Sequence, residues 1–123
     1  MKTIGNCVII YRVVGNSGPF VSNWVLEKKQ AKEIMDTQEG YIILDTRAQD
    51  EYDESHIPGA ILIPHDQILA KAESVLTDKD QLILVYCRSG NRSKQASEKL
   101  VALGYTNVVE FGGIIDWPYE IVK

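Results

Sequence analysis

The sequence has little cysteine and little histidine, which limits the kinds of site it could build. Two cysteines, Cys7 and Cys87, and two histidines, His56 and His65, occur among 123 residues. Two cysteines are too few for a disulfide framework, and no C-x-x-C pair suggests a zinc site. We therefore expect neither a metal ion nor an organic cofactor.

The chain also lacks an excess of positive charge and a long hydrophobic run. Its formal net charge is -4, which argues against a general nucleic-acid binder. The apolar stretch at 7–14 is interrupted by Arg12, is too short to cross a bilayer, and is not followed by an A-x-A cleavage pattern. We expect no nucleic-acid or membrane partner and a cytoplasmic location, with a periplasmic or exported protein as the alternative.

The length and composition are those of one folded domain. Hydrophobic residues make up 45% of the chain and charged residues 24%, so a core can form without disulfides or metals. A turn-like "GNSGP" stretch at 15–19 follows the first apolar residues. We expect residues 1–23 to be an N-terminal extension, which could add a strand, and residues 24–123 to be the domain itself.

Apolar runs and helical spacing alternate along that domain. The runs predict strands at 41–45, 60–63, 81–87 and 107–111, and the spacing predicts helices at 27–38, 65–76 and 91–104, with helical turns near 48–54 and after 112. In the second helix, Ile68, Ala72 and Val75 are expected to share the buried face. Because the strands are apolar on both sides, the pattern is typical of a parallel sheet covered by helices on both faces.

One stretch, "VYCRSGNRSK" at 85–94, carries chemistry. Cys87 falls at the carboxyl end of the strongest strand, where α/β folds bind ligands. A thiol becomes a good nucleophile when it ionises. The unpaired N–H groups where the strand turns into a helix, together with Arg88 and Arg92, favour the thiolate and form a cradle for an anion. Gly90 lets the loop curl.

Two kinds of reaction use such a cradle, phosphate-ester cleavage and sulfur transfer. Cysteine phosphatases have five residues between the cysteine and the arginine, whereas only four separate Cys87 from Arg92. The shorter loop suits a sulfur atom attached to the cysteine better than a phosphoryl group. A phosphatase or arsenate reductase is therefore disfavoured.

Three blocks in this order resemble the single-domain rhodaneses, which are thiosulfate or polysulfide sulfurtransferases. The blocks are "ILDTRAQDEYDESHIPGAILIP" (43–64), "VYCRSGNRS" (85–93) and "LGYTNVVEFGGIIDW" (103–117). The resemblance covers about residues 24–122 and implies a three-layer α/β/α fold with a central parallel five-stranded sheet. Thr46 and Ser55 depart from the residues usual at their positions, where an aliphatic residue and a glycine are common.

The resemblance implies a role for each candidate residue. Cys87 is the expected nucleophile and carries the sulfur as a persulfide. Arg88 and Arg92 are both expected to bind the anion, with Arg88 meeting the substrate and Arg92 also bracing the loop. The expected sources of anion-binding N–H groups are Ser89, Gly90, Asn91 and Ser93, and the expected structural supports are Asp45, Arg47 and His56.

The expected substrates are a small sulfur-containing anion as donor and a thiol, a protein cysteine or cyanide as acceptor. One alternative comes from a different functional class. A non-catalytic rhodanese-like module that binds a partner or senses redox state would have the same fold, although the intact cysteine and arginines argue against it.

Overall fold

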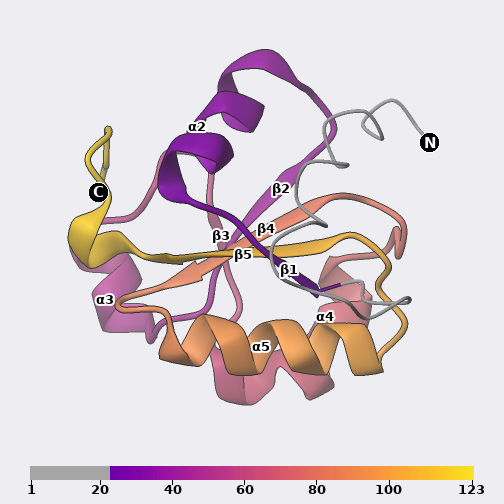
Figure 1. Cartoon of the computed structure of the whole chain (residues 1–123). Helices are drawn as coiled ribbons and strands as arrows, with labels where there is room; N and C mark the ends of the chain where they lie inside the picture. The colour runs from indigo at the N-terminus through magenta and orange to yellow at the C-terminus, as the bar shows by residue number, and fades with distance from the viewer. Residues whose placement is uncertain (1–22) are drawn as a thin grey trace.

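The computed structural model describes residues 23–123, which form a single α/β unit around one sheet (Figure 1). The strands are Asn23–Val25 (β1), Ile42–Asp45 (β2), Ile61–Leu62 (β3), Ile83–Cys87 (β4) and Val108–Gly113 (β5). The α-helices are Lys28–Thr37 (α2), Gln49–Glu54 (α3), Ile68–Val75 (α4) and Asn91–Ala102 (α5), and 3-10 turns occupy His65–Gln67 (η1) and Ile114–Asp116 (η2).

The five described strands run parallel in the order β1-β5-β4-β2-β3. This confirms the predicted fold class, an α/β fold with a parallel five-stranded sheet between helical layers. Strand β4 lies at the centre, flanked by β2 and β5, and every residue in it is buried. Cys87 is its last residue, so the thiol lies at the carboxyl edge of the most protected strand.

Each face of the sheet has its own apolar core. Side chains of β4 alternate between them, with Leu84 and Tyr86 in one core and Ile83 and Val85 in the other. Helix α2 packs in the first core, whereas α4 and α5 pack together in the second. Figure 1 shows α4 and α5 on the side of the sheet opposite α2.

One side chain differs from the sequence-based expectation, and one predicted segment lies outside the described residues. Val75 was expected on the buried face of its helix, but it is 48% exposed, and Leu76 instead is 1% exposed. The prediction is wrong because Leu76, whose backbone N–H still donates to the carbonyl oxygen of Ala72, continues the buried stripe of Ile68 and Ala72, and Val75 lies at the edge of that stripe. The predicted N-terminal extension covers residues 1–23. Of these, residues 1–22, which include Cys7, lie outside the described part of the chain. Within residues 23–123, no helix has the length and apolarity to cross a membrane.

The contrast between these two neighbours gives a test of the packing. Leu76→Ala should lower the free energy of unfolding by about 2–5 kcal/mol, because it leaves a cavity between α4 and the sheet. Val75→Ala, an adjacent change at an exposed position, should alter it by less than about 0.5 kcal/mol. Urea unfolding followed by circular dichroism measures both. Equal losses of stability in the two variants would contradict the burial of Leu76 and the exposure of Val75.

Candidate active site

Cys87 is fully buried, and its sulfur atom contacts the loop that follows it. The backbone N–H of Gly90 donates a hydrogen bond to Cys87 Sγ, with the nitrogen 2.9 Å from the sulfur. The hydroxyl oxygen of Ser93, in the first turn of α5, lies 3.4 Å from the same sulfur. The loop therefore wraps the thiol and directs a backbone N–H dipole at its sulfur atom.

Two glycines make this tight loop sterically feasible. Gly90 precedes α5 with φ of 109°, in the left-handed region that side chains rarely adopt. Gly113, at the end of β5, pairs with Cys87, and a Cβ placed on it would lie 1.9 Å from the carbonyl oxygen of Arg88. A side chain at residue 113 would therefore push the loop away from the sheet.

The two arginines of the loop have different surroundings. Arg92 makes a bidentate ion pair with Glu51 of α3, with Nη–Oε distances of 2.7 and 3.0 Å. Arg88 is exposed, and no hydrogen bond or ion pair joins its guanidinium to another described residue. Arg92 thus contacts another element of the fold and Arg88 does not, while the expected roles of both in anion binding stay predictions. Ser89 and Asn91 are also exposed, at the mouth of the loop.

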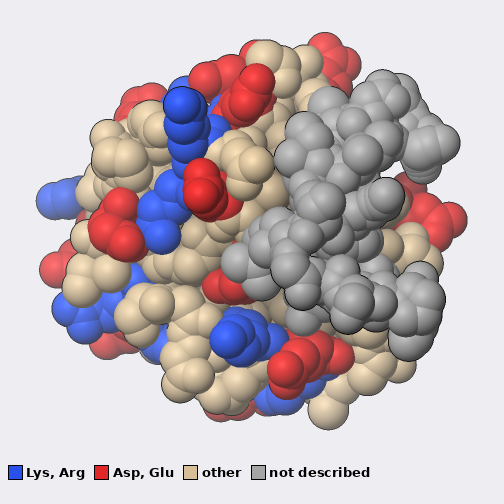
Figure 2. Space-filling model, viewed as in Figure 1, with Lys and Arg blue, Asp and Glu red and all other residues tan. Residues whose placement is uncertain are grey.

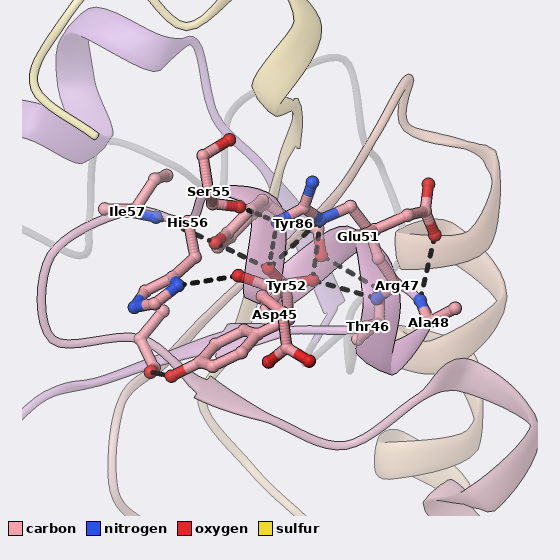
Figure 3. A network of polar contacts seen from close by, with 12 residues as sticks. Asp45, Thr46, Arg47, Ala48, Glu51, Tyr52, Ser55, His56, Ile57 and Tyr86 are labelled. Atoms are coloured by element: carbon pink, nitrogen blue, oxygen red, sulfur yellow. Dashed lines mark hydrogen bonds and ion pairs between the residues drawn. The ribbon is translucent and has the colours of Figure 1, made fainter. Parts of the chain in front are cut away.

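Asp45, Arg47 and Tyr86 form a buried network next to the loop (Figure 3). The Arg47 guanidinium donates to both carboxylate oxygens of Asp45, with the shortest distance 2.7 Å, and the backbone N–H of Arg47 donates to Asp45 Oδ1 at 2.9 Å. The hydroxyl of Tyr86 donates to Asp45 Oδ2 at 2.8 Å. Burial and the Asp45 carboxylate raise the pKa of Tyr86, so the phenol keeps the proton it donates.

The remaining motif residues extend this network away from the sulfur. Arg47 Nη2 donates to the carbonyl oxygen of Ser55 at 2.6 Å, and the Thr46 hydroxyl donates to the carbonyl oxygen of Tyr86 at 2.8 Å. The ring of His56 stacks on Tyr52, with centroids 3.9 Å apart, and His56 Nδ1 lies 2.9 Å from the Tyr52 carbonyl oxygen. The structure thus places Asp45, Arg47 and His56 in contacts with neighbouring protein groups, and their supporting role stays a prediction.

Three residues near the site were not singled out from the sequence: Glu51, Tyr86 and Glu110. Glu51 and Tyr86 pair with predicted residues across the fold, at sequence separations of 41 residues. Only a tertiary structure shows such pairings. Glu110 could have been noticed, because it is the single charged residue in the predicted strand 107–111. It is 5% exposed and lies close to Ser93.

On the face seen in Figure 2, outside the grey residues, lysine and arginine side chains lie among aspartates and glutamates. The described part of this face therefore mixes charges of both signs.

The sequence matches the family described as "Rhodanese-like domain" over residues 24–118. It is 37% identical over 80 residues to the thiosulfate sulfurtransferase PspE of Escherichia coli, an alignment that covers 65% of this chain and 77% of PspE. A protein named sulfurtransferase from Allochromatium vinosum is 32% identical, with 77% of this chain and 87% of that protein covered. The adenylyltransferase and sulfurtransferase UBA4 of Candida albicans is 30% identical over 84% of this chain, which spans 25% of that longer protein.

Solved structures are also similar to this chain in fold. A structure described as rhodanese with anions from E. coli superposes with a TM-score of 0.63 at 35% identity, covering 68% of this chain and 98% of that one. The Alr3790 protein of Anabaena superposes with a TM-score of 0.72 at 28% identity, covering 78% of each chain.

The Glu51–Arg92 pair predicts a specific pH dependence. The hydrogen bonds from Arg92 lower the pKa of Glu51 from 4.5 to about 2. The ionised carboxylate therefore stabilises the folded state fully above its unfolded pKa, and this contribution is lost as the pH falls from about 4.5 towards 2. Thermal unfolding should show wild type more stable than Glu51→Gln at neutral pH, with the difference shrinking in acid.

Glu54→Gln is the matched control, since Glu54 is exposed on the same helix. Its difference from wild type should be small at neutral pH. A Glu51→Gln difference that stayed constant down to about pH 3 would contradict the ion pair.

Proposed function

The chain belongs to the rhodanese-like family, and we propose that it is a sulfurtransferase that works through a persulfide on Cys87. It would move a sulfane sulfur from thiosulfate or a polysulfide to a thiol or cyanide acceptor. The observation that carries this proposal is the buried Cys87 sulfur with the Gly90 N–H directed at it, 2.9 Å away. A backbone donor in that position stabilises negative charge on the attacking sulfur and on the persulfide.

In the first half-reaction, the Cys87 thiolate attacks the outer sulfur of thiosulfate. A new S–S bond forms to Cys87, the S–S bond of thiosulfate breaks, and sulfite leaves with the electron pair. The product is a Cys87 persulfide whose terminal sulfur is an anion. It would lie in the loop between Cys87 and Arg92, within reach of the N–H groups at the start of α5.

In the second half-reaction, an acceptor nucleophile attacks the terminal sulfur. The persulfide S–S bond breaks, the electron pair returns to Cys87, and the acceptor leaves carrying the sulfur, as thiocyanate when cyanide is used. The two half-reactions form a ping-pong scheme. In a cell the acceptor would be a thiol or a protein cysteine.

The other residues of the site would support these steps without bonding to the sulfur. The exposed Arg88 would attract the donor anion, since its guanidinium is not engaged by another described residue. Arg92, held by Glu51, would keep the loop in its closed shape. Ser89 and Asn91 would border the entrance, where their N–H groups can meet the anion.

Replacement of the two cysteines separates the nucleophile from the rest of the chain. Cys87→Ser should abolish thiosulfate:cyanide sulfur transfer with an unchanged fold, because a serine hydroxyl remains protonated and forms no persulfide. Cys7→Ser should retain most of the activity. Thiocyanate production measures both, with circular dichroism as the fold control. An active Cys87→Ser variant would overturn the proposal, and a folded wild type without transfer activity would favour the non-catalytic module.

Replacement of the exposed arginine tests the entry of the anion. Arg88→Ala should raise the KM for thiosulfate about two- to fivefold with little change in kcat, since an exposed charge contributes up to about 1 kcal/mol. Lys71→Ala removes the same charge from an exposed position on α4 and should leave the KM unchanged. Steady-state kinetics at low ionic strength give both constants. Equal effects of the two variants would show that Arg88 provides only general charge.

A further inference from the structure

A buried carboxylate lies beneath the proposed nucleophile. Glu110 belongs to β5, faces α5 rather than α2, and is 5% exposed. Among the salt bridges of residues 23–123, none includes it. A buried acidic side chain without a basic partner is costly in its ionised form, so its presence in an otherwise apolar strand calls for a chemical explanation.

Only neutral groups donate to Glu110 in the described part of the chain. The backbone N–H of Gly112 donates to Oε2 at 2.9 Å, and the Ser93 hydroxyl donates to the same oxygen at 2.8 Å. Gly90 is also close, since a Cβ built on it would lie 3.8 Å from Oε2. The carboxylate is thus held against the underside of the loop that wraps Cys87.

The Ser93 hydroxyl connects this carboxylate to the thiol. Its oxygen lies 3.4 Å from Cys87 Sγ, in the position of an acceptor for the S–H group. It also lies 3.0 Å from the Gly90 carbonyl oxygen and 3.4 Å from the Gly112 carbonyl oxygen. A hydroxyl has a single hydrogen, and an ionised carboxylate is the strongest of these acceptors. The hydrogen bonds therefore run in one direction, from Cys87 to Ser93 to Glu110.

We propose that Glu110 is a positioning residue that shares one proton with Cys87 through the hydroxyl of Ser93. The proposed transfer begins with the S–H group of Cys87 and the carboxylate of Glu110. On formation of the thiolate, the S–H bond breaks as Ser93 takes that proton, while the former hydroxyl proton of Ser93 forms an O–H bond on Glu110. The Ser93 hydroxyl then donates to the thiolate, and no external acid or base is required.

The charges around the pair explain why one proton would be shared. Two adjacent buried anions repel each other, so ionisation of both Cys87 and Glu110 is disfavoured. Arg92 interacts electrostatically with Cys87 from α5, and Arg88 follows it directly in the chain. From α2, Lys28 approaches Gly112, but it pairs with Asp116 at 3.1 Å. The basic groups thus favour one negative charge in the loop, which the proton transfer places on sulfur.

This inference rests on the proposed function for its purpose. A neutral Glu110 would remove a repelling charge beneath a loop that receives an anionic sulfur donor. The proton sharing itself is independent of sulfur transfer. It can therefore be measured on protein without any sulfur donor, so that failure of one proposal does not decide the other.

The test is the rate of Cys87 alkylation by iodoacetamide as a function of pH, with Cys7→Ser as the background. Glu110→Gln keeps the side-chain shape and removes the proton acceptor. Its alkylation midpoint should move to lower pH by about one unit, because the loss of the carboxylate breaks the hydrogen-bond chain that holds a proton on the pair and removes the repulsion between two anions. Glu98→Gln removes the same charge from an exposed position on α5 and should leave the midpoint in place. An unchanged or higher midpoint in Glu110→Gln would overturn the proposal.

A double-mutant cycle tests whether the effect passes through Ser93. In a Ser93→Ala background, Glu110→Gln should shift the midpoint by less than half as much as it does with Ser93 present. An equal shift in both backgrounds would mean that Glu110 acts as a charge alone, and the role of Ser93 would be wrong.

A measurement on the unmutated pair keeps the proposal falsifiable if a variant fails to fold. The carboxyl carbon of Glu110 can be followed by NMR in ¹³C-glutamate-labelled protein of the Cys7→Ser background, against pH. If the proton is shared, the Glu110 signal should change at the pH at which Cys87 ionises, because interacting groups titrate together. Blocking Cys87 as a methyl disulfide removes the S–H group and should abolish that change. A Glu110 titration curve that is the same with and without the block would overturn the sharing of a proton.

Discussion

The site depends on the buried carboxylate of Asp45 and the donors that satisfy it. A buried charge without partners would be strongly destabilising, and here Arg47 and Tyr86 supply the donors from two directions. Tyr86 belongs to β4 and directly precedes Cys87, and its oxygen also accepts a hydrogen bond from the Ile57 N–H at 3.1 Å. This one carboxylate therefore fixes the ends of β2 and β4 and the segment after α3 relative to one another.

The loop around Cys87 is built against that fixed frame. Glu51 on α3 holds Arg92 from one side, and Glu110 on β5 holds Ser93 from another. Both acidic residues lie outside the cysteine motif, yet each contacts a residue within it. The loop thus has acidic residues as neighbours on two sides, in a chain whose net charge is -4. In the proposed function, directed N–H groups rather than bulk charge would hold a small anion there.

Much of the fold could be predicted from the sequence because buried parallel strands and amphipathic helices have clear patterns. The runs that end in Asp45 and Cys87 indicated β2 and β4. The spatial order of the strands and the short β1 could not be predicted, because local periodicity carries no information on sheet neighbours. Val75 lies at helical spacing from Ile68 and Ala72 and is nevertheless exposed. Spacing alone therefore does not determine which residue at a helix end is buried.

The candidate site was predictable to a similar degree. The loop residues and the Asp45–Arg47 pair follow from motifs that are continuous in sequence. The partners that shape the loop, Glu51 and Glu110, come from other elements, and their contacts with Arg92 and Ser93 became visible only when the chain was folded. Ionic and hydrogen-bonded contacts between distant elements have no periodic signature, whereas apolar burial has one.

The central claim is that Cys87 carries a sulfur atom during the reaction, and mass spectrometry tests it most directly. The protein is incubated with thiosulfate, freed of reagent and examined intact and as peptides, before and after cyanide is added. We expect a gain of one sulfur atom on the peptide that contains Cys87, and its complete loss with cyanide. A folded protein that gains no sulfur, or gains it on Cys7 alone, would contradict the account.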